Sequence, residues 1–207
     1  MSKYLLTPSL INSFQYYMKD EWKSPADSRA DFLRTLSRER FEPNEAMQKG
    51  IDFESDIELA TNDLNVIDIT HEDYDERQHI INQIAKIVKG GIWQATCKKE
   101  MQIGDNNFLL YGRCDVVKAD MIYDIKFTGK YDIGKFSDSI QHLIYMYCLD
   151  MPKFAYLVSD GKSFWREDYF ADNLETRIRS KIGDFLQYLE RDKEASDIYF
   201  DKWESKY

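Results

Sequence analysis

Residues 108–145 read FLLYGRCDVVKADMIYDIKFTGKYDIGKFSDSIQHLIY, and this stretch decides the fold. Its first part alternates like a β-strand, so that two sets of side chains face opposite ways. One face carries Leu110, Gly112 and Cys114, and the other carries Tyr111, Arg113 and Asp115. A short polar turn at residues 118–120 reverses the chain, and a second strand follows at residues 121–127. The pattern therefore predicts a β-hairpin.

Two acidic residues and a lysine come together if this hairpin forms. Asp124 and Lys126 share one face of the second strand, because residues two apart point the same way. Asp115 can then lie near Asp124 across the strand pair. Two carboxylates without a cation between them repel each other and are costly to desolvate. A divalent ion removes this cost, and Mg²⁺ prefers hard oxygen ligands, so the hairpin predicts an Mg²⁺ site.

Length and composition indicate a globular protein with a real hydrophobic core. The chain has 207 residues, of which 43% are hydrophobic and 31% charged. We expect a single domain over 1–207, with a helical N-terminal part at 1–91, a sheet-bearing core at 92–170 and C-terminal helices at 171–207. The net charge of -9 argues against a broad basic surface for nucleic acid, but a local basic groove stays compatible with it.

Two further features bear on location and redox state. No apolar run approaches the roughly 18 residues that span a bilayer, and the N-terminus lacks the pattern of a signal peptide, so we expect a cytoplasmic protein without membrane contact. The three cysteines, Cys97, Cys114 and Cys148, are widely spaced and form no CxxC pair. Buried, reduced thiols are therefore expected.

The order of helical and strand-like patterns predicts the fold class. After a loop, a first helical pattern, capped by Thr7 or Ser9 with Pro8 in its first turn, runs to about residue 22. Further helical patterns cover 26–38, 43–61, 71–90, 137–151 and 173–190, and a short helix follows. Strand-like patterns cover 92–103, 108–117, 121–127, 154–159 and 162–170. This order indicates an α/β domain with a mixed central β-sheet flanked by helices.

The helix expected at 43–61 has an apolar stripe with one unusual residue. The stripe contains Met47, Ile51, Phe53 or Glu54, Ile57 and Ala60. Gly50 lies within this helix and costs it about 1 kcal/mol relative to alanine. A packing or functional reason for this glycine is therefore expected.

Three motifs in this order resemble the PD-(D/E)XK nuclease superfamily, and its RecB-type exonuclease branch in particular. They are G-R-C-D at 112–115, D-I-K at 124–126 and Q-H-L-I-Y at 141–145, the last matching a QxxxY helix. That branch also has an earlier helix with a glycine and, about four residues on, a His or Glu, as in Gly50 and Glu54. The resemblance covers roughly residues 47–158 and the opening SxxxSFxxYY-like segment. It implies a restriction-endonuclease-like core.

The resemblance also implies a role for each motif residue. The implied metal ligands are Glu54, Asp115, Asp124 and the backbone carbonyl of Ile125. Lys126 would orient the attacking water and help to deprotonate it, because an ammonium group beside that water stabilises hydroxide. Gln141 and Tyr145 lie four residues apart on one helix face. In the family this pair lies beside the active site and contacts the substrate or positions the lysine and the water.

Simpler interpretations remain open for single motifs. A D-x-K triplet alone is typical of a solvated strand surface. Glu54 lies among other acidic residues of its helix, and Asp56 or Glu58 could be the ligand in another register. Gln141 and Tyr145 could be an ordinary surface residue and core residue. The order and spacing of all the motifs together favour the nuclease interpretation.

Three departures from the family pattern shape the expected cofactors. Glu54 stands where many relatives have His, and an all-oxygen ligand set favours Mg²⁺, with Mn²⁺ as a substitute. Phe127 stands where relatives often have Thr. Some members hold an iron–sulfur cluster with one cysteine before the nuclease core and three after it. No cysteine precedes Cys97 or follows Cys148, so we expect no such cluster.

Basic residues near the motifs are candidates for DNA contacts. We expect phosphate contacts from Arg113, Lys130 and Lys135, with Lys118 and Lys126 nearby and Lys98 and Lys99 on the preceding strand. Such contacts would make binding salt-dependent. Any one of these lysines could equally be an ordinary solubilising residue.

The sequence therefore predicts a metal-dependent DNA exonuclease acting on linear or single-stranded ends. The alternatives are an endonuclease on the same core and a nuclease-like protein that binds nucleic acid without cutting it. No GxxxxGK[ST] motif is present, so unwinding would need a helicase as partner. By analogy, small members of this group act in phage or mobile-element recombination and repair, where a single-strand annealing protein would be another partner.

Overall fold

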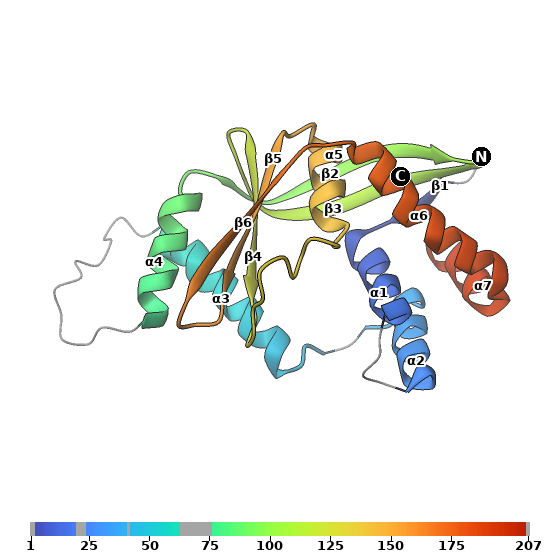
Figure 1. Cartoon of the computed structure of the whole chain (residues 1–207), viewed down its shortest axis with the longest axis horizontal. Coiled ribbons are helices and arrows are strands. Elements are labelled where there is room, and N and C mark those ends of the chain that lie inside the picture. Colours follow the sequence, from blue (N-terminus) through green and yellow to red (C-terminus); the bar gives the residue numbers. More distant parts are fainter. Residues whose placement is uncertain (1–2, 20–23, 41, 63–75, 206–207) are drawn as a thin grey trace.

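A six-stranded mixed sheet forms the centre of the computed structural model, which describes residues 3–19, 24–40, 42–62 and 76–205 (Figure 1). The strands are β1 (Lys3–Leu6), β2 (Ile92–Ile103), β3 (Asn106–Lys118), β4 (Met121–Phe127), β5 (Lys153–Ser159) and β6 (Phe164–Phe170). They lie in the order β1-β3-β4-β5-β6, and β2 pairs with β3. Two pairings are parallel, β1 with β3 and β4 with β5, and the others are antiparallel. The predicted mixed α/β fold is confirmed.

Strand β3 changes its partner along one edge. It pairs with β1 as far as Leu110 and with β4 from Val116 onward. Residues 111–115 lie between these two pairings, and they include the G-R-C-D motif. The backbone of this segment is thus free at that edge to contact side chains rather than another strand.

Helices cover both faces of the sheet (Figure 1). They are α1 (Pro8–Lys19), α2 (Pro25–Leu36), α3 (Glu45–Asn62), α4 (Glu76–Val88), α5 (Gln141–Leu149), α6 (Leu174–Arg191) and α7 (Lys193–Lys202). One hydrophobic cluster joins α3 and α4 to the sheet, and a larger one joins the remaining helices to it. The arrangement is consistent with a restriction-endonuclease-like core. No helix in the described part of the chain is both long enough and apolar enough to cross a membrane.

Local capping explains where several helices begin. The Thr7 hydroxyl accepts a hydrogen bond from the backbone N–H of Leu10, which caps α1 just before Pro8. Ser24 caps α2 in the same way, and Pro25 occupies its first turn. Asp192 accepts from the backbone of Ala195 at the start of α7. These are the residue types that satisfy the free N–H groups of a first helical turn.

The structure corrects two expected elements and describes only part of a third. Residues 3–6 form strand β1 rather than part of a loop, because Leu6 is buried and the strand finds its partner in the distant β3. Helix α5 begins at Gln141 rather than at 137, because turns that include a left-handed Gly134 precede it. The helix expected at 71–90 is α4, and residues 71–75 lie outside the described residues.

The buried side of α3 also differs from the expected stripe. Met47 and Ile51 are 45% and 50% exposed, whereas Phe53 and Ile57 are fully buried. The apolar contact is thus narrow and lies toward the C-terminal half of the helix. A short sheet-facing stripe of this kind is enough to hold the helix against β4, with Phe53 packed on Phe127.

The cysteines are free thiols. Cys97 and Cys114 are buried, as expected, while Cys148 is partly exposed. Cys97 pairs with Gly112 in the β2–β3 ladder, so Cys97 and Cys114 lie on neighbouring positions of one sheet face.

Candidate functional site

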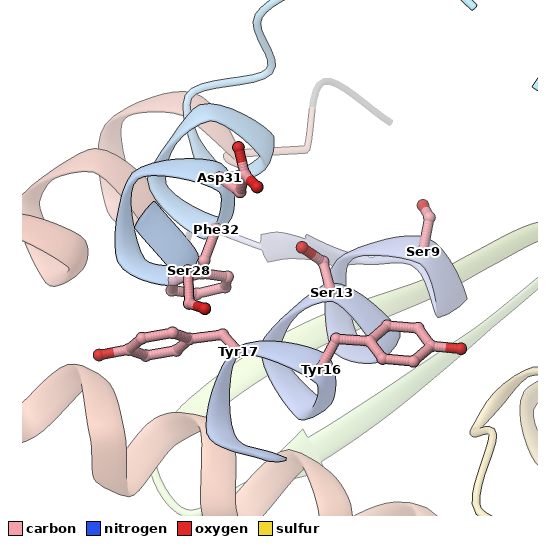
Figure 2. A pocket seen from close by; sticks show the side chains of 7 residues that line it. All are labelled: Ser9, Ser13, Tyr16, Tyr17, Ser28, Asp31 and Phe32. Atoms are coloured by element: carbon pink, nitrogen blue, oxygen red, sulfur yellow. The ribbon is translucent and has the colours of Figure 1, made fainter. Parts of the chain in front are cut away.

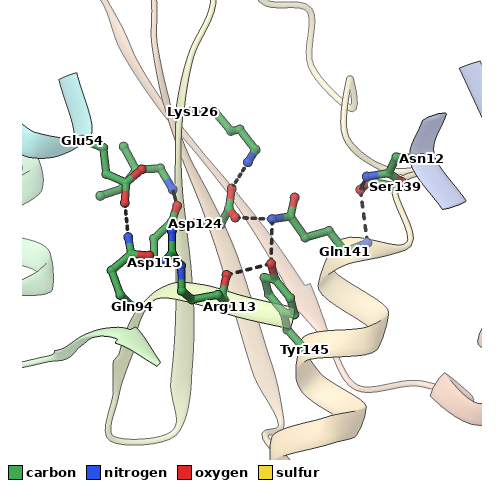
Figure 3. Close-up of polar contacts among 11 residues, drawn as sticks. Asn12, Glu54, Gln94, Arg113, Asp115, Asp124, Lys126, Ser139, Gln141 and Tyr145 are labelled. Carbon is green, nitrogen blue, oxygen red and sulfur yellow. Dashed lines mark hydrogen bonds and ion pairs between the residues drawn. The ribbon is translucent and has the colours of Figure 1, made fainter. Parts of the chain in front are cut away.

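Strand β4 carries the centre of the candidate site (Figure 3). Asp124 is fully buried, and its Oδ2 lies 2.5 Å from Nζ of Lys126, two residues along the same strand. Gln141 of α5 donates a hydrogen bond from Nε2 to the other oxygen, Oδ1, at 2.5 Å. The D-x-K motif and the QxxxY helix therefore meet at one carboxylate.

Asp115 lies where β3 turns from one partner to the next. Its Oδ2 accepts a hydrogen bond from the backbone N–H of Ile125 at 2.8 Å. The β3–β4 ladder ends at Val116 and Tyr123, so this side chain binds β4 beyond the end of the ladder. The hairpin thus brings Asp115 next to the segment that carries Asp124.

Glu54 reaches the same region from helix α3. Its Oε1 accepts a hydrogen bond from Nε2 of Gln94 on β2. The alternative ligand Asp56 instead accepts from Arg77 of α4 at 2.7 Å, so it is turned away toward that helix. The register of α3 therefore favours Glu54 over Asp56 as the residue that faces the D-x-K strand.

Tyr145 fixes α5 against the sheet. Its hydroxyl donates to the carbonyl of Arg113 at 2.8 Å and accepts from Nε2 of Gln141 at 3.3 Å. A Cβ atom at Gly112 would overlap Cε1 of the Tyr145 ring. The glycine of the G-R-C-D motif is thus required for the close approach of α5.

A contact from α1 holds the start of α5. Asn12 Oδ1 accepts from the backbone N–H of Ile140 at 3.2 Å, and Nδ2 of Asn12 donates to the Ser139 hydroxyl at 3.0 Å. The Ser139 hydroxyl in turn accepts from the N–H of Gln141 at 3.2 Å. Helix α5 has no cap from its own N-cap side chain, Ile140, so α1 and Ser139 satisfy its first N–H groups.

Burial and mutual repulsion perturb the acidic residues. Burial raises the pKa of Asp115 well above its ordinary value, and the charge of Asp124 adds to this shift. Burial and the Asp124 charge likewise raise the pKa of Glu54, against the opposing effects of Lys126 and Arg113. Burial raises the pKa of Asp124 as well, although Lys126 counteracts it. A bound cation stabilises the ionised form of carboxylates most strongly where they are desolvated and repel one another, as these three do.

The pKa of Lys126 is raised although burial opposes its charge. The negative charges of Asp124, Asp115 and Glu54 outweigh that burial. Lys126 is therefore an ammonium group held beside the carboxylates, and its side chain is 31% exposed to solvent. It can donate hydrogen bonds to a group that enters from solvent.

The residues present match the chemistry of a hard divalent ion. Oδ2 of Asp124 is buried and makes no hydrogen bond, its only close partner being the Lys126 ammonium group. The candidate ligands are all oxygen atoms, which suits Mg²⁺ or Mn²⁺. In the described part of the chain, no group of three or more His, Cys, Asp or Glu side chains is placed so that it could hold a metal ion. The carboxylates contact protein groups instead. Gln94 donates to Glu54, the Ile125 N–H donates to Asp115, and Gln141 donates to Oδ1 of Asp124, while Lys126 forms an ion pair with Oδ2.

The basic residues divide into two groups. Arg113 is exposed beside the site, Lys130 is 84% exposed, and Lys135 binds the Thr128 hydroxyl and the Lys130 carbonyl on the loop after β4. Two other candidates, Lys118 near the motifs and Lys99 on the preceding strand, contact protein groups. Lys118 binds the Ile87 carbonyl at the end of α4, and Lys99 binds Asp150 and the Tyr147 carbonyl at the far end of α5.

Sequence reasoning missed the supporting residues Gln94, Asn12 and Ser139. Each acts through contacts between segments distant along the chain. Gln94 and Ser139 belong to no motif, and Asn12 occupies an unspecified position of the opening SxxxSFxxYY-like segment. The only local signal is the position of Ser139 just before the α5 helix, where serine is a common capping residue.

A separate hollow lies between α1 and α2, with a volume of about 250 Å³ (Figure 2). Its lining residues are Ser9, Ser13, Tyr16, Tyr17, Ser28, Asp31 and Phe32. The opening SxxxSFxxYY-like segment thus places its serines and tyrosines here, whereas Asn12 of the same helix turns toward α5. Tyr16 is 72% exposed at the rim.

Comparison with known proteins supports the fold and leaves the family open. Neither a protein-family model nor a curated protein sequence matches the chain. The solved structure titled "Crystal structure of SSO0001" aligns with 91% of this chain and 77% of its own, at 10% identity and a TM-score of 0.54. Rai1 from Scheffersomyces stipitis aligns with 93% of this chain but 62% of its own, at 12% identity and a TM-score of 0.37. At such identities the first similarity shows the fold alone.

Proposed function

We propose that this protein is a metal-dependent nuclease that hydrolyses DNA phosphodiester bonds from DNA ends. The observation that carries the proposal is the buried Asp124 carboxylate, which meets both Lys126 and Gln141 beside two further acidic residues. Strongly perturbed ionisable groups cluster at functional sites more often than at structural ones. The order of motifs along the chain supports the same conclusion.

Each side chain has a role that its position allows. Glu54, Asp115, Asp124 and the Ile125 carbonyl would hold Mg²⁺, which would polarise a phosphoryl oxygen and offset charge on the departing 3′ oxygen. Lys126 donates a hydrogen bond to the attacking water, and its charge stabilises the hydroxide that forms as the proton of that water passes to bulk solvent. Gln141 orients the Asp124 carboxylate, and Tyr145 holds Gln141 against β3.

DNA would reach the site along its exposed basic side chains. Arg113, Lys130 and Lys135 would bind phosphates, and binding would weaken as salt concentration rises. A helicase or a single-strand annealing protein would supply ends in a recombination or repair pathway. This wider role rests on the family resemblance alone.

The test is digestion of end-labelled linear DNA and closed circular DNA with Mg²⁺ or with EDTA. We expect nucleotides to be released from linear DNA only, and only with the metal. Asp124→Asn and Lys126→Met keep side-chain size and should reduce the rate by about 10³-fold. Circular dichroism checks that both variants are folded.

The alternative functions give different results in the same assay. An endonuclease would nick the closed circles. A protein that binds without cutting would retard labelled DNA in a gel and leave it intact. Equal digestion by the wild type and by both variants would reveal a contaminating nuclease and would end the proposal.

A further inference from the structure

One residue of the candidate site has an unusual backbone. Gln94 has φ +52° within strand β2, in the left-handed region that side chains with a Cβ rarely adopt. The other non-glycine residues with positive φ in the described part of the chain lie in turns or at helix ends: Arg38, Ala119, Asp150 and Asn173. Among these residues, Gln94 therefore stands out because it has a left-handed backbone inside a β-strand.

The unusual backbone coincides with a gap in strand pairing. The β2–β3 ladder pairs Trp93 with Val116 and Ala95 with Cys114, and it has no pair at Gln94 and Asp115, which lie between them. The alternation of buried faces also shifts there. Cys114 belongs to the larger hydrophobic cluster, whereas Val116, two residues on, belongs to the cluster under α3 and α4. Regular pleating would place both on the same face.

The side chain of Gln94 uses this geometry to reach α3. Its amide donates to Oε1 of Glu54, across 40 positions of sequence. That hydrogen bond holds Oε1 of the Glu54 carboxylate, and the other oxygen, Oε2, takes no part in it. Figure 3 shows Gln94, Glu54 and Asp115 grouped on one side of β4. Strained backbone of this kind persists where the surrounding structure and function require it.

We propose that Gln94 is a positioning residue, whose left-handed backbone turns its amide onto Glu54 and releases Asp115 from regular pairing so that both carboxylates face a divalent ion. The inference rests on the proposed function, because it assigns Gln94 to the same metal site. Groups that hydrogen-bond to metal ligands typically change metal affinity 10- to 100-fold when they are removed.

Two substitutions separate the backbone from the amide. Gln94→Met keeps the length of the side chain and the strained backbone but removes the hydrogen bond. Gln94→Gly removes both the hydrogen bond and the strain, because glycine adopts positive φ without a Cβ clash. A matched control is Ala119→Gly, which relieves a φ of +51° in the β3–β4 turn without touching Glu54.

The readouts are Mn²⁺ affinity by calorimetry and the midpoint of thermal unfolding. We expect Mn²⁺ binding to weaken about tenfold in Gln94→Met and in Gln94→Gly. Gln94→Gly should nevertheless melt roughly 2–4 °C above Gln94→Met, because it loses the left-handed penalty. Ala119→Gly should melt higher than the wild type and bind Mn²⁺ with unchanged affinity.

The possible failures are distinguishable. If the wild type binds Mn²⁺ and both Gln94 variants bind it within twofold of the wild type, the positioning role is wrong and the proposed nuclease remains. If the wild type binds no Mn²⁺ at all, both the positioning role and the metal-dependent function fail. A purely structural role would lower the melting midpoint of Gln94→Gly and leave Mn²⁺ affinity unchanged, which also overturns the inference.

Discussion

Two helices form opposite walls of the candidate site, α5 on one side and α3 on the other, and they differ in how much of each helix is buried. The α5 wall, with Gln141 and Tyr145, belongs to a helix whose residues 142–146 are all buried. The α3 wall, with Glu54, belongs to an 18-residue helix with only Phe53 and Ile57 buried. Glu54 lies on the wall with the fewer core contacts, so its placement depends more on a single hydrogen bond from β2.

This difference shows how a fold can fix some catalytic groups and leave others adjustable. Core packing permits few alternative positions for α5, since interiors are close-packed. A helix held by a narrow apolar contact can shift by small amounts at low cost. If a metal ion binds between the two walls, α3 would shift to accommodate it and α5 would not. Substitutions in the two helices should therefore have different effects on stability.

The largest effect at neutral pH is expected at the close contact between α5 and Gly112. Gly112→Ala should destabilise the protein by about 2 kcal/mol, because the added methyl group overlaps the buried Tyr145 ring, which is held by Arg113. Urea unfolding measures the loss. Adding Tyr145→Leu should recover part of it, because the smaller side chain makes room. A destabilisation below about 0.5 kcal/mol would show that α5 is as adjustable as α3.

The next effect concerns acid stability of the α5 wall. His142 is fully buried, stacks on Tyr169 at 4.2 Å, and has no hydrogen bond on either ring nitrogen. Burial, together with the charges of Arg177 and Lys181, lowers its pKa to about 3. The unfolded chain binds a proton near pH 6.5, so folding stability is lost as the pH falls from there toward 3, at about 1.4 kcal/mol per pH unit.

Comparison of wild type with His142→Phe isolates this contribution. Urea unfolding between pH 7 and 4.5 should show a flatter dependence for the variant, which keeps an aromatic ring against Tyr169. The buried acids have raised pKa values and act in the opposite direction, but they are common to both proteins and cancel in the difference. Parallel pH profiles would mean that His142 is not held neutral in the folded protein.

A smaller effect is expected from the contact between α1 and α5. Asn12→Ala removes the acceptor for the Ile140 N–H and should cost about 1 kcal/mol, the usual value of a helix cap. Gln141 should then be less ordered, and the rate of DNA cleavage should fall. Asn12→Asp keeps an acceptor and places a negative charge at a helix N-terminus, so it should restore stability. Equal losses in the two variants would contradict the capping role.

The part of the site that local sequence could predict lies along one hairpin and the next helix. Strand alternation and a tight turn bring Asp115, Asp124 and Lys126 together. Helical spacing places Gln141 and Tyr145 on one helix face, and only the family resemblance assigned that face to the site. Their separations are short, so local geometry largely decides which residues can meet. The mixed α/β class and most element positions were predictable for the same reason.

The remaining features depend on contacts between distant segments. Strand β1 is four residues long, which is too short to show the alternation of apolar and polar residues that marks a strand. It forms because it pairs with the free edge of β3. The left-handed Gln94 has no sequence signal, since glutamine is not a residue that favours positive φ. Met47 and Ile51 were predicted to be buried because apolar spacing gives a stripe but not its extent. Features of this kind can be identified only from the packing of the folded chain.

The smallest effect is expected at the glycine of the α3 wall, which contrasts with Gly112. A Cβ added at Gly50 would meet no atom within 4 Å, and its backbone is ordinary helix. Gly50→Ala should therefore raise the free energy of unfolding by about 0.5–1 kcal/mol, through helix propensity alone. Urea unfolding measures this gain beside the loss in Gly112→Ala. Opposite signs for the same substitution would establish that α5 is tightly packed and α3 open, whereas a loss at both glycines would mean that α3 packs as closely as α5.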